Sequence, residues 1–331
     1  WRRKLKQDWE LHGTATYRYV KEGQQQRTVI LRLPEGRLTG NLVEMLQQFR
    51  KEWLQYFQPY PAEEAPDWDT FVSAFSDVLT MMQNPEVTLP PITGQTLRQF
   101  IKRWGNDKAG GLDGWQVLDF KKLPLVALDW LAEFFNVVED TGQWPVALLQ
   151  GRKALIPKAG DEGGAVSYSA LEQRPLTVLT LAYRLWAGAR LVQYNPFVEQ
   201  WIHPSLRGGA PGREVNDVWY EMSLAVEQAL LEGGVTVQDG LCGMPMDLQK
   251  AFDLCPTEIT MRLLEHTGMP KPIVKALRGF YSGIHCVFAH GGVVGERFHK
   301  TAGLFQGCPW SMLAMSNMTT VWAHLMDRQQ V

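Results

Sequence analysis

A chain of 331 residues is long enough to form one large hydrophobic core or two smaller ones. Its hydrophobic fraction of 45% and charged fraction of 21% are ordinary for a globular protein, and its net charge of −2 gives no global attraction to nucleic acid. Any nucleic-acid surface must therefore be local, and no apolar run reaches the roughly 20 residues of a membrane span, so we expect no membrane contact.

The first predicted elements along the chain are helical. Apolar residues recur at helical spacing in three stretches, which predicts helices at 40–57, 69–83 and 95–104. Proline-containing segments at 58–68 and 85–94 separate these helices. We therefore predict an N-terminal helical extension over residues 1–90, followed by a second unit over residues 91–331.

The second unit mixes helices with short strands. Further helices are predicted at 124–139, 176–195, 213–232, 257–266, 271–282 and 309–328. Strands are predicted within 152–161, at 240–247, and as a hairpin over 284–301 around two glycines. The elements alternate without the even spacing of a TIM barrel or a Rossmann sheet, which favours an α+β fold.

The four cysteines of the chain are widely spaced. Cys242, Cys255, Cys286 and Cys308 include no CxxC pair, so neither a zinc site nor a disulfide framework is indicated. Reduced thiols are typical of intracellular proteins, and we expect an intracellular location.

The stretch "MDLQKAFD" at 246–253 carries the first candidate site. Asp247 follows an apolar run that begins at Leu241 and predicts a short buried strand. A carboxylate at the end of such a strand is held rigidly, and it can ligate Mg²⁺ together with water and substrate phosphates. The alternative interpretation is an acid that caps the next helix, and this stretch alone does not decide between the two.

Two further stretches carry polar side chains that suit a phosphorylated ligand. Lys158 and Arg174 lie on either side of a predicted turn, where they would either contact a triphosphate or remain solvated surface charges. Gln306 and Gly307 lie in "GLFQGCP". The glycine would allow the backbone to come close to a ligand, and the amide would hydrogen-bond a base or a sugar. The alternative interpretation is that the stretch is a tight turn.

The order of six such stretches carries a family resemblance. They are "KAGGLDGW", "ALIPKAGD", "EQRPLTVLTLAYRLWAGARL", "GGAPGREVNDV", "MDLQKAFD" and "GLFQGCPWSML". In this order they resemble the reverse transcriptase domain of non-LTR, LINE-type retrotransposons, over about residues 90–328. The same blocks are shared less closely with group II intron proteins.

The resemblance implies a right-hand polymerase fold, here the fingers and a partial palm preceded by the helical extension. It implies that Asp247 binds the two catalytic Mg²⁺ ions, with the backbone carbonyl of Leu248 as a second contact. Phe252 would be an aromatic gate that excludes a ribose 2′-hydroxyl by steric conflict. Asp253 would be a structural acid that caps or anchors the turn.

The resemblance also assigns the remaining candidate residues. Lys158 and Arg174 would hold the triphosphate from the fingers. Gln306 and Gly307 would lie near the nucleotide and the template. Lys108, Asp113 and Gly114 would lie in a loop of the fingers.

The third palm motif of the family, which contains an Asp-Asp pair, does not occur in the sequence. One carboxylate cannot hold two Mg²⁺ ions against their mutual repulsion. We therefore expect the chain to be a fragment, truncated before that motif, that does not polymerise DNA by itself.

The implied partners are an RNA template, a DNA primer and deoxynucleoside triphosphates, with a ribonucleoprotein formed on the element RNA. The implied location is the nucleus and the cytoplasm. Two alternatives remain open, namely a degenerate retroelement remnant that binds nucleic acid without catalysis and a maturase-like intron protein.

Overall fold

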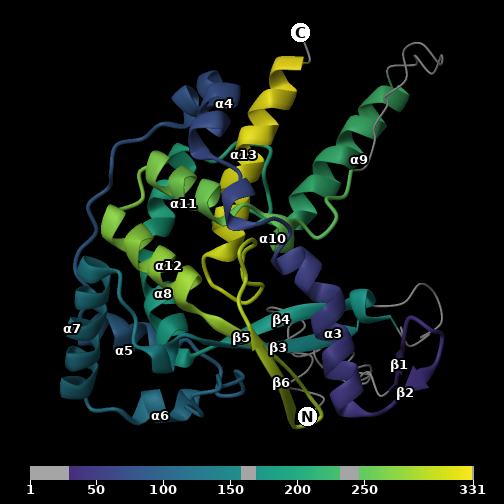
Figure 1. Cartoon of the computed structure of the whole chain (residues 1–331). Coiled ribbons are helices and arrows are strands. Elements are labelled where there is room, and N and C mark those ends of the chain that lie inside the picture. The colour runs from purple at the N-terminus through teal and green to yellow at the C-terminus, as the bar shows by residue number, and fades with distance from the viewer. Residues whose placement is uncertain (1–29, 158–168, 232–245, 330–331) are drawn as a thin grey trace, which may run out of the picture.

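The computed structural model describes residues 30–157, 169–231 and 246–329. These parts combine helices and strands in an α+β architecture, as the sequence predicts (Figure 1). The central sheet has four strands in the order β4 (Gln173–Leu179), β3 (Gln150–Pro157), β5 (His285–His290) and β6 (Val293–Phe298). β3 runs parallel to β5, whereas the β3–β4 and β5–β6 pairs are antiparallel.

Most helices lie where apolar periodicity predicts them. They are α3 (Leu42–Phe57), α4 (Trp68–Met82), α5 (Gly94–Lys102), α6 (Val117–Lys122), α7 (Leu125–Thr141), α8 (Leu181–Tyr194), α9 (Val215–Leu231), α10 (Ala251–Leu254), α11 (Thr257–His266), α12 (Lys271–Gly283) and α13 (Ser311–Gln329). The short helices α6 and α10 were not predicted, and neither was the small β1–β2 pair of Leu31–Arg32 and Leu38–Thr39.

The predicted helix at 176–195 is wrong in its first part. Residues up to Leu179 belong to β4, and α8 begins only at Leu181. Thr177 and Val178 are β-branched and pair with Lys153 and Arg152 of β3, so sheet pairing prevails over an apolar run that also fits a helix. The hairpin prediction is confirmed, with Gly291 and Gly292 between β5 and β6.

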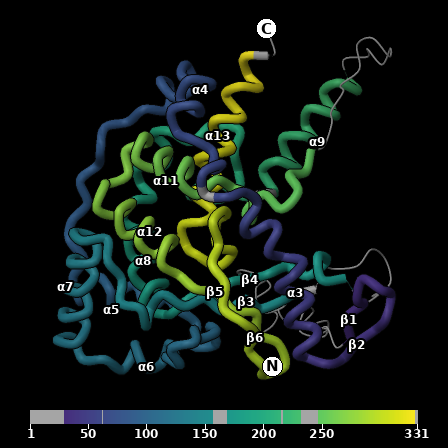
Figure 2. Tube along the Cα trace, viewed as in Figure 1, coloured from purple at the N-terminus to yellow at the C-terminus, as the bar shows by residue number. Residues whose placement is uncertain are grey.

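Helix α3 packs along the sheet and contributes to the main hydrophobic core (Figure 2). The ring of Phe57 stacks on Phe298 of β6 with a centroid separation of 5.6 Å. Trp53 is buried and its Nε1 donates to the Ala170 carbonyl at 3.0 Å. Helix α3 thus shares the main core with the sheet, whereas the buried residues of α4 belong to a second cluster with residues of α11 and α13.

A buried ion pair joins the helices on the other side of the molecule. Arg190 of α8 donates two hydrogen bonds to Glu139 of α7, at 2.6 and 2.5 Å, and Trp186 donates a third at 2.6 Å. Gly279 of α12 lies so close to Gly142 that a Cβ atom at position 279 would be 1.8 Å from the Gly142 carbonyl oxygen. These contacts fix α7 against α8 and α12.

Within the described ranges, no helix is both long and apolar enough to cross a bilayer. Cys255, Cys286 and Cys308 are buried free thiols, and Cys242 lies outside the described residues.

Candidate functional site

Two stretches singled out in the sequence lie side by side in the fold. The main-chain N–H of Leu304 donates to the Phe252 carbonyl at 2.6 Å, and that of Gly303 donates to the Cys255 carbonyl at 2.8 Å. At position 303 a Cβ atom would lie 2.4 Å from the Asp253 carbonyl oxygen, so glycine is required for this approach. These contacts join the "KAFD" segment, which is residues 250–253 together with the following Leu254 and Cys255, to the "GLFQG" segment (303–307) in one unit.

Asp253 lies at the centre of this unit. Its side chain is 1% exposed, and its two oxygens accept from Lys300 Nζ at 3.3 Å and from Gln306 Nε2 at 2.9 Å. The carboxylate therefore anchors the segment that follows β6 against α10. The amide N–H of Gln306, predicted to recognise a nucleotide, donates to a protein carboxylate in this structure.

Strand β4 joins the same unit. The Thr177 N–H donates to the Gln306 carbonyl at 2.6 Å. Gly307 has a φ of 124°, and a Cβ atom there would lie 2.2 Å from the Thr177 carbonyl oxygen. In this structure Gly307 therefore allows the backbones of β4 and the "GLFQG" segment to approach each other closely.

Two lysines that the sequence did not single out are buried beneath these segments. Lys153 of β3 and Lys300 both lie over the ring of Phe57, with Nζ-to-centroid distances of 4.6 and 4.5 Å. Burial, together with the neighbouring Lys300 charge, lowers the pKa of Lys153 to about 7, and burial also lowers the pKa of Lys300. Among the described residues, Lys153 Nζ has no hydrogen-bond partner.

A third lysine, Lys250, ties the "KAFD" segment to the N-terminal part of the molecule. Its φ of 53° is the only positive value of a non-glycine residue in the described parts of the chain. Its Nζ donates to the Leu171 carbonyl at 2.7 Å and lies 4.1 Å from the Trp53 ring centroid. The backbone turn that begins α10 is thus held by Trp53 of α3 and by the Leu171 carbonyl just before β4.

The predicted metal ligand Asp247 lies in an exposed, irregular stretch. Residues 246–248 are not in a strand, and Met246 and Leu248 are 60% and 61% exposed. The prediction of a buried strand that ends on Asp247 is therefore wrong for its last two residues, and 240–245 lie outside the described residues. In the described parts, no group of three or more His, Cys, Asp or Glu side chains is placed to hold a metal. The residues present therefore do not by themselves fit a two-metal site.

Arg174 is exposed on β4, opposite Ile156 of β3 in the strand register. Lys158, its predicted partner, lies outside the described residues, although β3 ends only one residue earlier, at Pro157. Arg174 is three residues from Thr177 along the strand, or about 10 Å at roughly 3.3 Å per residue. It therefore lies on the strand that meets Gln306.

The loop with Lys108, Asp113 and Gly114 lies at the opposite end of β4. A Cβ atom on Gly111 would lie 2.8 Å from Thr180 Cα, just beyond the strand, and Arg184 Nη1 donates to the Ala109 carbonyl at 2.7 Å. Burial raises the pKa of the Asp113 carboxyl and lowers that of Lys108. The loop is thus separated from Arg174 by most of the strand.

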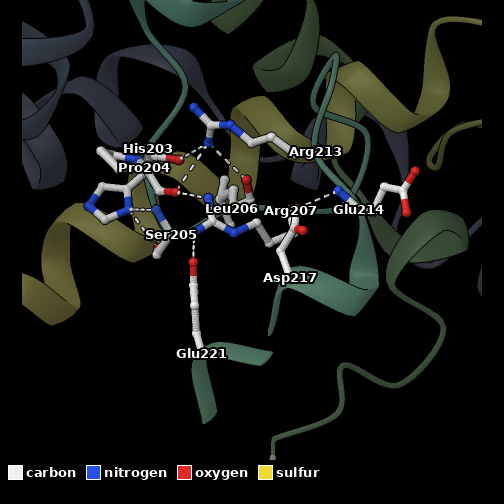
Figure 3. Close-up of polar contacts among 9 residues, drawn as sticks. All are labelled: His203, Pro204, Ser205, Leu206, Arg207, Arg213, Glu214, Asp217 and Glu221. Carbon is white, nitrogen blue, oxygen red and sulfur yellow. Dashed lines mark hydrogen bonds and ion pairs between the residues drawn. The ribbon is translucent and has the colours of Figure 1, made fainter. Parts of the chain in front are cut away.

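The stretch "GGAPGREVND" forms a separate polar network around Arg213 (Figure 3). Nη1 of Arg213 donates to three main-chain carbonyls, those of His203 at 2.9 Å, Pro204 at 3.2 Å and Leu206 at 2.9 Å. Arg207 pairs with Glu221 of α9. Arg213 therefore fixes the course of the loop that leads into α9.

The chain is distantly similar to a transposon protein. It is 24% identical over 225 residues to the transposon TX1 uncharacterized 149 kDa protein of Xenopus laevis, a match that covers 67% of this chain. The same match covers 16% of that protein, so the chain corresponds to a small part of its length. No protein-family profile matches the chain.

Proposed function

We propose that the chain is the fingers and part of the palm of an RNA-directed DNA polymerase from a LINE-type retrotransposon. The observation that carries the proposal is the contact of three motif segments through Asp253, Gln306 and Thr177. The order of the six motifs and the distant similarity to a transposon protein also support it.

In this proposal Asp247 and the Leu248 carbonyl are one side of a Mg²⁺ site. Asp247 is exposed and available to a ligand, and Mg²⁺ takes few protein ligands. Because the described residues supply a single carboxylate at this position, the other carboxylates of a two-metal site must come from elsewhere in the complete protein.

The other predicted residues keep their proposed roles around the same unit. Arg174, together with Lys158, would hold the triphosphate. Phe252 would lie beneath the sugar, with Gln306 and Gly307 beside the nucleotide. The loop of Lys108, Asp113 and Gly114 would contact the template. The partners are then an RNA template, a DNA primer and deoxynucleoside triphosphates, in a ribonucleoprotein of the nucleus and cytoplasm.

Primer extension by the complete element protein tests this proposal. The reaction contains an RNA template, a DNA primer, the four deoxynucleoside triphosphates and Mg²⁺. Asp247→Ala should abolish extension while leaving the unfolding midpoint unchanged, because Asp247 is exposed. A matched control is Asp140→Ala, which removes another exposed carboxylate, on α7, and should leave extension intact.

Extension by Asp247→Ala at the rate of the parent protein would reject the metal assignment. If the parent protein extends no primer but binds the template, the non-catalytic remnant becomes the better description.

A further inference from the structure

A basic pocket is lined by residues of α5, α6 and α7 and of the turn between α6 and α7. These three helices lie at the end of the molecule away from α9 and α13 (Figure 1). Its volume is about 560 Å³, within the usual range of ligand pockets. Four cations line it, namely Arg98 and Lys102 of α5 and Lys121 and Lys122 of α6, and no acidic side chain of the described residues does. For a chain of net charge −2, this is a marked local excess of positive charge.

None of these four cations forms an ion pair with a carboxylate of the described residues. Arg98 donates to the Leu123 carbonyl at 3.3 Å, and Lys121 donates to the Trp104 carbonyl and to Asn106. These neutral acceptors position the two side chains without cancelling their charge. Other arginines, such as Arg190 and Arg278, are matched by glutamates.

The partial negative charges at helix C-termini do not account for this cluster of four cations. Lysines in the last turn of a helix offset the partial negative charge of its C-terminus, and Lys102, Lys121 and Lys122 all lie in last turns. Two helix ends, however, carry only about half a unit of negative charge each, against four full positive charges. Arg98 lies in the middle of α5 and outside this explanation. A net positive charge therefore remains for an anion.

An aromatic side chain next to the pocket indicates the class of anion. Phe120 lines the pocket, and the ring of Trp115 lies 5.3 Å from the Phe120 ring, centroid to centroid. Trp115 is 46% exposed, so one part of the indole is available for stacking. Cations that follow a backbone, combined with an exposed aromatic ring, are typical of single-stranded nucleic-acid sites.

We propose that this pocket binds backbone phosphates of a single-stranded nucleic acid. The inference relies on the proposed function only in taking nucleic acid as the ligand. Lys102 and Lys122 are exposed, and they contact the phosphates. Arg98 and Lys121 are held by carbonyl groups and set the positive potential of the pocket wall.

The test is binding of a fluorescent single-stranded RNA to the full chain, measured by anisotropy at several salt concentrations. The variant carries Lys102→Glu and Lys122→Glu. Its control carries Lys51→Glu and Lys271→Glu, which change the net charge equally at exposed positions on α3 and α12. Circular dichroism and the unfolding midpoint establish that both variants are folded.

The pocket variant should bind about tenfold more weakly than the control near 0.1 M salt. The slope of log affinity against log salt should fall by about 1.4, since each lost phosphate contact of a single strand contributes roughly 0.7.

Equal losses in both variants, or no loss in the pocket variant, would overturn the proposal. So would unchanged RNA binding with lost binding to phosphatidylserine-containing vesicles, which would identify a lipid site. Failure of primer extension is a separate result, because Asp247→Ala does not alter this pocket.

Discussion

Lys300 Nζ lies 3.3 Å from Asp253 Oδ1, and these two side chains are only 2% and 1% exposed. This ion pair joins the segment after β6 to the "KAFD" segment, which are 47 residues apart in the sequence. Because both charges are removed from water, each is stabilised mainly by the charge of its partner. Loss of one partner therefore leaves a buried charge uncompensated.

Asp253→Asn should lower the free energy of unfolding by about 3 kcal/mol, as expected when one member of a buried ion pair is removed. Urea unfolding at neutral pH measures this loss. Gln306 Nε2 can still donate to the amide oxygen of the introduced asparagine, so the cost comes mainly from Lys300.

Lys300→Met provides the control for that assignment. In the double variant the buried ammonium is absent, so the added cost of Asp253→Asn should shrink by at least about 1 kcal/mol in a double-mutant cycle. Additive losses would show that the pair is not coupled.

Lys153 should make the stability of the protein depend on pH. Its pKa is about 7 in the folded protein and 10.5 in its ordinary state, so between these values the unfolded chain binds the extra proton. The contribution of Lys153 to the free energy of unfolding is therefore most favourable at high pH. It becomes less favourable as the pH is lowered from about 10.5 to 7, and it is constant below pH 7. Each pKa unit is worth about 1.4 kcal/mol, so the change amounts to several kcal/mol.

Lys153→Met removes the titrating group and keeps a long, unbranched side chain. Urea unfolding at pH 7 and pH 8.5 should show a smaller rise in stability with pH for the variant than for the parent chain. Cys286 lies close to Lys153, and burial raises the pKa of its thiol, so the comparison stays below pH 9. Parallel pH profiles for the two proteins would contradict the assignment.

The sequence predicted correctly those helices whose own residues contain both the apolar periodicity and the capping residue that begins or ends the helix. Helix α3 has an apolar stripe and begins after Asn41, whose side chain accepts from the N–H groups of Val43 and Glu44. Helix α7 ends at Gly142, which has a φ of 73° and closes the helix in the left-handed conformation.

Strand β4 shows why other elements were not predictable. Residues 176–187 are largely apolar at both alternating and helical spacing, so the run fits a strand or a helix equally well. Only pairing with β3, which precedes it in the chain, makes its first part a strand.

The candidate site was predictable in its residue types but not in its contacts. The sequence singled out Gln306 and assigned Asp253 a structural role, but their hydrogen bond spans 53 residues. Lys153 was missed because a lysine within a strand is normally solvated. Its burial depends on Phe57 of α3, which is distant in the sequence.

Under the proposed function, Phe252→Val should allow the complete polymerase to incorporate ribonucleotides. If Phe252 is the sugar gate, its removal should raise the ribonucleotide-to-deoxyribonucleotide rate ratio about tenfold or more, equivalent to roughly 1.4 kcal/mol. Single-nucleotide primer extension measures the ratio. Phe71→Val, at a half-buried position on α4, controls for general loss of packing. An unchanged ratio in a folded Phe252→Val protein would exclude the gate.

Gly307→Ala should destabilise the protein more than an ordinary glycine substitution. At a φ of 124° an alanine is strained, and its Cβ would lie 2.2 Å from the Thr177 carbonyl oxygen, so β4 and the "GLFQG" segment would have to separate. We expect a loss of about 3 kcal/mol, well above the roughly 1 kcal/mol of left-handed backbone strain alone. Gly292→Ala is the matched control, because Gly292 has a φ of 83° and no atom within 4 Å of its Cβ position. Similar unfolding midpoints for the two variants would mean that the close approach to Thr177 contributes nothing to stability.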